Sequence, residues 1–112
     1  LRIGEILVQV SQPRDPCYKL SARLNDSTVL KPYLERGLVG FYVRVLETGT
    51  VAAGDEITMV TRAVDSITIR ELSSLYHNQR EDIAGIRQAL TIDTLADAWR
   101  KPLQKRLDQL LL

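Results

Sequence analysis

The spacing of apolar residues changes once along this chain of 112 residues, close to Val64. Before that point, apolar and polar residues alternate in residues 6–11, 41–46 and 56–61, which is typical of β-strands with one buried face. After it, apolar residues recur every three or four positions, which is typical of packed helices. The chain is therefore predicted to be an α+β protein, with antiparallel β-strands in residues 1–64 and a small three-helix module in residues 65–112.

The predicted strands form a meander, because residues 47–55 between the second and third strands contain two glycines that mark turns. A short helix is predicted between the first two strands, in residues 27–36, with Ser27 or Thr28 as its cap and Gly37 as its stop. The second strand is expected to turn one apolar face inward, formed by Phe41, Val43 and Val45.

Three short helices are predicted in the second part of the chain. Thr68, with Glu71 three residues later, matches a capping box that starts the first helix. The second is predicted over residues 81–90 and the third from Asp93 onward, where Pro102 should kink or divide it. Helices this short are not stable alone in water, so they must pack on one another. Their common core is expected to form around Leu75, Ile86, Leu95 and Trp99.

Composition disfavours several classes of function. Fifteen Lys and Arg against fourteen Asp and Glu give a net charge of +1, so there is no general electrostatic reason to expect nucleic acid or an anionic membrane as partner. No apolar run approaches the roughly 18 residues needed to span a bilayer. Cys17 is the single cysteine and cannot form an intrachain disulfide. A cytoplasmic protein without a membrane segment is predicted.

The residues that specify chemistry are concentrated in residues 13–19, with the sequence Pro-Arg-Asp-Pro-Cys-Tyr-Lys. Its two prolines predict a stiff, extended loop after the first strand. Arg14 and Lys19 place two cations near the thiol of Cys17 and favour its thiolate form, which binds transition metals and attacks electrophiles. Cys17 is therefore a candidate metal ligand and equally a candidate nucleophile.

The rest of the sequence narrows the kinds of site that Cys17 can form. A tetrahedral zinc site is disfavoured, because there is no second cysteine and the single histidine, His77, lies far along the chain in a predicted helix. A metal bound by Cys17 would therefore take most of its other ligands from a cofactor. The competing interpretation is structural, since a lone cysteine after a strand is often a small buried hydrophobe.

Residues 11–20, Ser-Gln-Pro-Arg-Asp-Pro-Cys-Tyr-Lys-Leu, resemble the signature of MOSC domains, the family named after the C-terminal domain of molybdenum cofactor sulfurases. Gly4, the segment Gly-Phe-Tyr-Val-Arg-Val-Leu of residues 40–46, and the turn residues Gly49, Gly54 and Asp55 are similar to the YiiM-type bacterial branch. Proteins of that branch end in a small 3-alpha domain, which residues 95–100 and 105–107 resemble. The resemblance covers almost the whole chain.

The resemblance implies a MOSC β-barrel-like fold in which Cys17 ligates the molybdenum of the pterin cofactor, molybdopterin, and thereby serves catalysis. It matches Arg14 and Lys19 to basic positions that would bind the cofactor, and Tyr42 is a further candidate for the same pocket. The implied reaction is a molybdenum-dependent reduction of N-hydroxylated bases or related compounds, with an electron-donor protein as partner. The N-terminal half of the MOSC domain has no counterpart in these residues, so the chain is expected to be a fragment of such a reductase.

The alternative function is a non-catalytic binding module. The C-terminal helices resemble a helix-turn-helix arrangement that would dock DNA or a protein, including a second copy of the chain as a homodimer. DNA is disfavoured, because residues 62–112 carry eight Lys and Arg against seven Asp and Glu.

Plain structural roles are expected for several polar residues outside this motif. Asp55 is expected to make a turn bond rather than to act as a catalytic carboxylate. His77 is expected to satisfy carbonyls at a helix end. A solvated helix face is expected for the basic residues near the C-terminus, which are Arg100, Lys101, Lys105 and Arg106.

Overall fold

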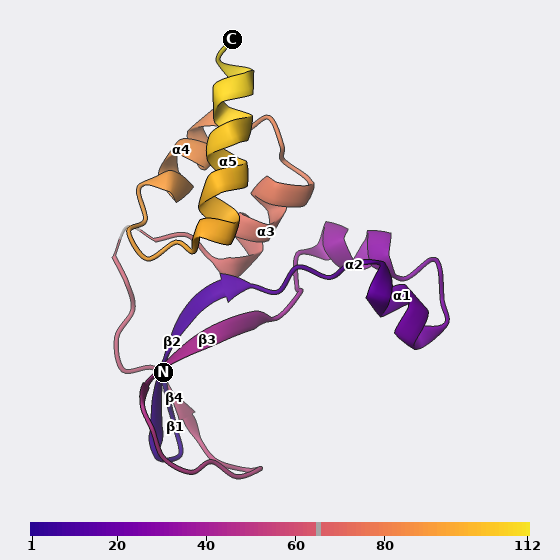
Figure 1. Cartoon of the computed structure of the whole chain (residues 1–112). Helices are drawn as coiled ribbons and strands as arrows, with labels where there is room; N and C mark the ends of the chain where they lie inside the picture. Colours follow the sequence, from indigo (N-terminus) through magenta and orange to yellow (C-terminus); the bar gives the residue numbers. More distant parts are fainter. Residues whose placement is uncertain (65) are drawn as a thin grey trace.

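The computed structural model describes residues 1–64 and 66–112. In chain order its elements are β1 (Arg2–Ile3), β2 (Ile6–Pro13), α1 (Tyr18–Leu24), α2 (Leu30–Arg36), β3 (Phe41–Glu47), β4 (Ile57–Thr58), α3 (Ile69–His77), α4 (Ile83–Leu90) and α5 (Asp97–Leu110). Figure 1 shows the three C-terminal helices gathered beyond one end of the sheet, while α1 and α2 project to one side. The predicted α+β class, with strands first and a helical module after them, is confirmed.

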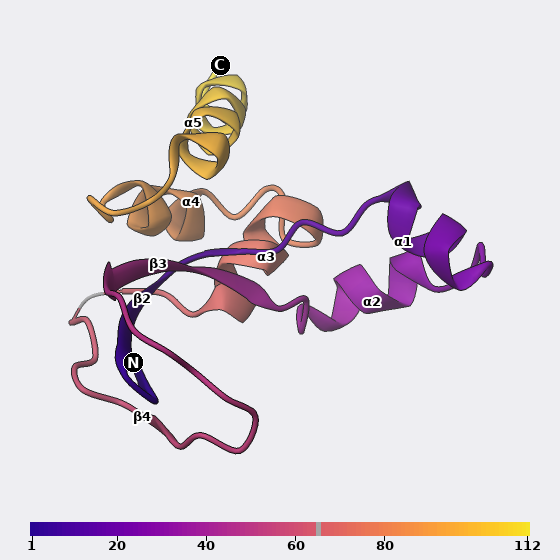
Figure 2. The same cartoon turned by 60° about the horizontal axis from the view of Figure 1, so that its bottom comes forward.

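The strands form one antiparallel sheet in the order β3-β2-β1-β4. Its longest pairing joins β2 to β3, where Val8 lies opposite Val45 and Val10 opposite Val43. The register shifts between Val10 and Gln12, which is the signature of a β-bulge. Across the described strands the sheet is open, with β3 and β4 as its two edges, and it does not close into a barrel (Figure 2).

The carboxylates of Glu5 and Asp55 stabilise the turns beside β1 and β4. Glu5 accepts hydrogen bonds from the backbone amide and the hydroxyl of Thr50, at 3.0 and 2.8 Å, and these bonds lower the pKa of its carboxyl. Asp55 accepts one from the Ala52 amide at 2.7 Å, so its predicted role as a turn residue is confirmed. Gly4, with φ of 53°, lies so close to Asp55 that a Cβ atom there would collide with the carboxylate.

The predicted burial of β3 is wrong for this chain. Phe41, Val43 and Val45 are 51%, 40% and 53% exposed, although they alternate as expected. The reason is that β3 is an edge strand and that the helical module packs against β2 instead, where Val8 is buried. The third predicted strand is also much shorter than residues 56–61, because only β4 pairs with β1.

The segment between β2 and β3 contains one helix more than predicted. The helix α1 has no counterpart among the predicted elements, and neither α1 nor α2 has a buried residue. The cap of α2 is Val29 rather than Ser27 or Thr28; Asp26 accepts bonds from the amide and hydroxyl of Thr28, which lower the pKa of the Asp26 carboxyl. Gly37, in the left-handed conformation with φ of 69°, ends α2 as predicted.

The three C-terminal helices enclose the main core. The hydroxyl of Thr68 accepts from the Glu71 amide at the start of α3, and Asp82 accepts from the Gly85 amide at the start of α4. The helix α5 runs through Pro102 without division, because Trp99 and Leu103 on both sides of the proline are packed in the core. The buried residues of this core are Leu72, Leu75, Ile86, Ala89, Leu95, Trp99, Leu103 and Leu107.

The junction between the sheet and the helical module includes one residue that the structure does not describe. The boundary predicted between residues 64 and 65 falls at Asp65, which lies outside the described residues. Within the described part of the chain, no helix has the length and the apolar character that crossing a membrane requires.

Truncation of the central core residue tests the packing of the module. Leu103 has no solvent exposure, so Leu103→Ala should lower the free energy of unfolding by about 2–5 kcal/mol in urea titrations. Leu112→Ala makes the same change at a fully exposed position and should stay within about 0.5 kcal/mol of the parent protein. Equal effects of the two substitutions would contradict the assigned core.

Candidate functional site

The segment after β2 leads into α1 (Figure 1), and Cys17 is the residue directly before this helix. Its thiol is free and exposed, and its side chain makes no capping hydrogen bond to the helix, so the sulfur is available to a ligand. The predicted cationic neighbours, Arg14 and Lys19, are exposed as well. The structural alternative, in which Cys17 is a small buried hydrophobe, does not agree with this exposed position.

The segment that carries Cys17 is fixed to the sheet at its beginning. Pro13 is buried and pairs with Phe41, so β2 extends into the predicted loop. The Arg14 amide donates to the Gly40 carbonyl at 3.0 Å, and Pro16 is buried two residues later. The predicted stiff loop is thus confined to residues 14–17, and a helix rather than an extended chain follows Cys17.

Tyr42 belongs to the same end of the sheet. It lies opposite Gln12 in the pairing of β2 with β3, and its carbonyl accepts a hydrogen bond from the Ser11 hydroxyl at 3.2 Å. Its side chain is largely exposed. The fold therefore brings the backbone of Tyr42, from 25 residues further along the chain than Cys17, to the place where the Arg14–Cys17 segment leaves the sheet.

A contact that the sequence did not predict joins this segment to the helical module. His77, the last residue of α3, lies with its Nε2 atom 2.8 Å from Oδ1 of Asp15. An ionised carboxylate only accepts hydrogen bonds, so Nε2 carries the proton and donates it. The expectation that His77 satisfies helix carbonyls is wrong. No local pattern could have revealed the pair, because 62 residues separate its members.

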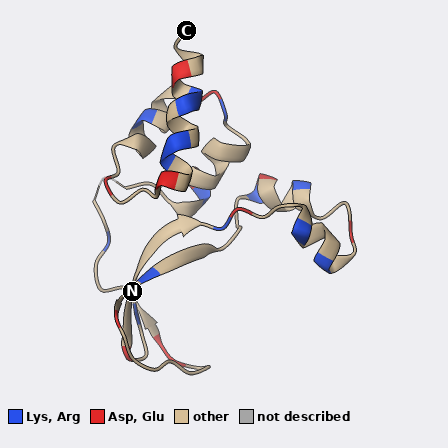
Figure 3. Ribbon diagram, in the orientation of Figure 1, with Lys and Arg blue, Asp and Glu red and all other residues tan. Residues whose placement is uncertain are grey.

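Figure 3 shows the basic residues that α5 carries, and this run is only partly solvated, because Arg100 and Arg106 are half-buried. Arg100 donates to the carbonyls of Leu90 and Ile92, where α4 ends. Lys101 and Lys105 are exposed, as predicted for the whole run. The expectation of a wet face is wrong for Arg100, because its guanidinium reaches across to a neighbouring helix end.

Arg106 makes the corresponding contact at the end of α3. It donates to the carbonyls of Leu75 and Tyr76, at 2.6 and 3.2 Å, and its guanidinium lies 5.4 Å from the centre of the Tyr76 ring. Burial, followed by repulsion from Arg80, lowers the pKa of Arg106. Arg106 thus supplies a donor to the Leu75 carbonyl at the end of α3, and it shares the Tyr76 carbonyl with Arg80, which donates to it at 2.9 Å.

The donor groups near Cys17 limit how a metal would be held. Among residues 1–64 and 66–112, no group of three or more His, Cys, Asp and Glu side chains is arranged to hold a metal ion. A metal on Cys17 would take its other ligands from a cofactor or from protein beyond these residues. The exposed thiol and the two flanking cations suit a soft metal held in an anionic cofactor.

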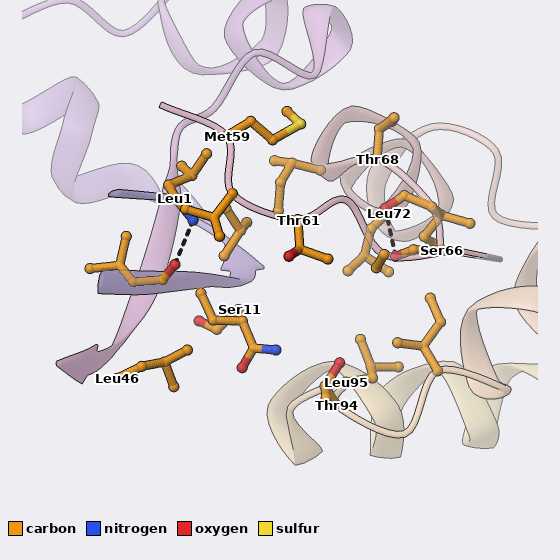
Figure 4. A pocket seen from close by; sticks show the side chains of 18 of the residues that line it. Leu1, Ser11, Leu46, Met59, Thr61, Ser66, Thr68, Leu72, Thr94 and Leu95 are labelled. Atoms are coloured by element: carbon orange, nitrogen blue, oxygen red, sulfur yellow. Dashed lines mark hydrogen bonds between the residues drawn. The ribbon is translucent and has the colours of Figure 1, made fainter. Parts of the chain in front are cut away.

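A pocket of about 430 Å³ lies elsewhere, between the sheet and the helical module. Figure 4 shows Leu46 and Met59 on one side of it and Leu72 and Leu95, from the helical module, on the other. Its lining is mainly apolar and does not include Cys17 or its flanking cations. This pocket is therefore distinct from the candidate site.

Comparison with known proteins gives matches over both parts of the chain. Residues 1–58 match the family described as MOSC domain, and residues 67–110 match the one described as YiiM-like, 3-alpha helix domain. The chain is 36% identical to the crystal structure of YiiM from Geobacillus stearothermophilus, with a TM-score of 0.87 over 95% of this chain and 54% of the other.

Curated relatives agree with the structural match. The identity is 32% to the uncharacterized protein YflK of Bacillus subtilis, over 98% of this chain and 50% of the relative, and 33% to the protein YiiM of Escherichia coli, over 94% and 46%. A protein named reductase from Gibberella moniliformis is 40% identical over 52% of this chain and 10% of its own length. The chain thus spans about half the length of YflK and YiiM.

Removal of the Arg106 guanidinium tests its role at the end of α3. Arg106→Ala should lower the free energy of unfolding by roughly 1–3 kcal/mol, because the Leu75 carbonyl loses its side-chain donor and the Tyr76 carbonyl keeps only the bond from Arg80. Lys105→Ala, at the exposed neighbouring position, should change it by less than about 0.5 kcal/mol. Urea unfolding of both variants gives the comparison, and a neutral Arg106→Ala would contradict the assignment.

Proposed function

Since the chain belongs to the MOSC domain family and carries a YiiM-like 3-alpha helix domain, we propose that it is part of a molybdenum cofactor-binding oxidoreductase in which Cys17 ligates the metal. The observation that carries the proposal is the exposed, unbonded thiol of Cys17, presented by a segment that the sheet holds in place. A thiolate is a soft ligand that suits a transition metal rather than magnesium or calcium.

The charges around Cys17 favour an anionic cofactor. Arg14 and Lys19 are exposed on both sides of the cysteine and make no ion pair with the acidic residues that the structure describes. We assign both to the phosphate of molybdopterin, for which the planar guanidinium of Arg14 offers two parallel donors. Tyr42, at the adjacent end of β3, is assigned to the same cofactor through its exposed side chain.

The proposed reaction is the reduction of an N-hydroxylated base. The N–O bond breaks, two electrons and two protons are taken up, and an amine and water are formed. When bound, the molybdenum cofactor supplies the two-electron redox chemistry, and an electron-donor protein supplies the electrons. The relative named reductase from Gibberella moniliformis supports this class of reaction. A reduced free thiol at Cys17 is consistent with a cytoplasmic setting.

The alternative of a DNA-binding module has lost support. Two of the four basic residues near the C-terminus, Arg100 and Arg106, donate to backbone carbonyls within the helical module and are not free to contact phosphates. Docking of a protein partner, including a second copy of the chain, stays a proposal that no specific contact of the described residues supports.

Substitution of the proposed ligand gives the most direct test. In protein produced in cells that make the cofactor, Cys17→Ser should lower the molybdenum content per chain by on the order of tenfold or more, because a neutral hydroxyl replaces a thiolate. Metal analysis by mass spectrometry measures it, with Ser21→Ala in the same helix as control. An unchanged molybdenum content in Cys17→Ser would remove the assigned ligand.

The two cations can be tested apart from the metal ligand. Arg14→Ala and Lys19→Ala should each weaken retention of the pterin cofactor roughly 10- to 100-fold, as expected for a lost hydrogen bond to a charged group. Arg23→Ala removes an equal charge from the last turn of α1 and is the matched control. Pterin fluorescence after dialysis at several salt concentrations measures the effect, and equal losses in all three variants would contradict a specific phosphate site.

A further inference from the structure

We infer that His77 of the helical module is a positioning residue for Cys17, acting through Asp15. The inference deepens the proposed function and rests on it, because it assigns to the helical module a part in shaping the cofactor site. The pair joins α3 to the segment that ends at Cys17, two residues beyond Asp15.

The geometry of the pair is that of a directed hydrogen bond. The distance of 2.8 Å between Nε2 of His77 and Oδ1 of Asp15 is in the range of charge-assisted bonds. The side chain of His77 is 18% exposed and that of Asp15 is 49% exposed, so the histidine is the sheltered partner. His77 is thus the more closely packed side of the contact.

His77 is fixed because its neighbour Tyr76 is tied into the core. The Tyr76 ring meets the His77 ring edge-on at 4.9 Å between centroids, and it meets Trp99 in the same way at 5.0 Å. Arg106 lies over the Tyr76 ring and also binds its carbonyl. The imidazole therefore stands at the end of α3 on a residue that is packed against α5.

Proline restricts the backbone of the segment of residues 14–17, which contains Asp15. Asp15 precedes Pro16, which confines the Asp15 backbone to extended conformations, and both Pro13 and Pro16 are buried. Fixing the Asp15 side chain therefore fixes the direction in which the chain continues to Cys17. No residue of α1 is buried, so packing of that helix does not supply the restraint.

A second contact joins the end of α3 to α2. The Asn78 side chain, directly after α3, donates to the Leu34 carbonyl of α2 at 3.2 Å. Gly37, which ends α2, lies so close to α3 that a Cβ atom there would be 2.9 Å from Cγ of Arg70. The end of α3 thus touches the Cys17 segment and also α2, which returns the chain to β3.

Backbone hydrogen exchange on the metal-free protein tests the inference. The amides of Arg14 and Leu20 report on both sides of Cys17, since they donate to the carbonyls of Gly40 and Cys17. His77→Ala should accelerate their exchange roughly three- to tenfold, the effect of losing one partly exposed charge-assisted bond. His77→Gln, whose amide can still donate to Asp15, should restore most of the protection.

A double-mutant cycle separates positioning from general destabilisation. Asp15→Ala should accelerate the same two amides as much as His77→Ala does, and the double variant should add little to either. The amide of Leu103 in the core should be unaffected throughout. Unchanged exchange at Arg14 and Leu20, additive effects of the two substitutions, failure of His77→Gln to restore protection, or equal acceleration at Leu103 would each overturn the inference.

Molybdenum content keeps the two proposals distinguishable. Loaded His77→Ala protein should bind less molybdenum than His77→Gln protein. Exchange that responds to His77 while Cys17→Ser keeps its molybdenum would leave the positioning role standing and reject the ligand assignment. If Cys17→Ser loses its molybdenum while hydrogen exchange is unchanged in the His77 variants, the ligand assignment stands and the positioning role is rejected.

Discussion

The packing of α3, α4 and α5 around Ile86 and Leu103 is the constraint on which the rest of the described structure depends. Among the described residues, eight of the ten buried aliphatic and aromatic side chains belong to this core, and the other two, Val8 and Val39, lie in the strand-bearing part. Burial of apolar surface is the main favourable term in folding, so the helical module is the stable body of the chain. The sheet and the helices α1 and α2 are ordered largely by attachment to it and by backbone pairing.

This distribution of stability bears directly on the candidate site. Cys17 stands on a segment with little packing of its own, between the end of the inner strand β2 and a short exposed helix. Three attachments bring it into a defined place, namely the Arg14 bond to Gly40, the two buried prolines and the Asp15 contact with His77. In the proposed function, the 3-alpha domain is therefore part of the site's support rather than an appendage to a MOSC domain.

The side chains of β3 are exposed because this strand lies at the edge of the sheet, away from the helical core. An edge strand with Phe41, Val43 and Val45 open to solvent is unusual, because such edges invite pairing with other strands. The chain also spans about half the length of YflK and YiiM, the relatives that it matches over nearly its whole length. The apolar alternation of β3 is thus a correct sign of a strand, whereas the burial of that strand depends on what lies beside it.

The sequence by itself determined the class of fold, the change from strands to helices, and the segment that carries Cys17, since these follow from local periodicity, proline geometry and side-chain chemistry. It also identified the helical core around Ile86 and Trp99. Only the tertiary structure decided that Asp15 meets His77, that Arg106 caps α3, and that β3 lies open. Those features join residues far apart in the chain, and no short-range pattern encodes which distant surfaces come together.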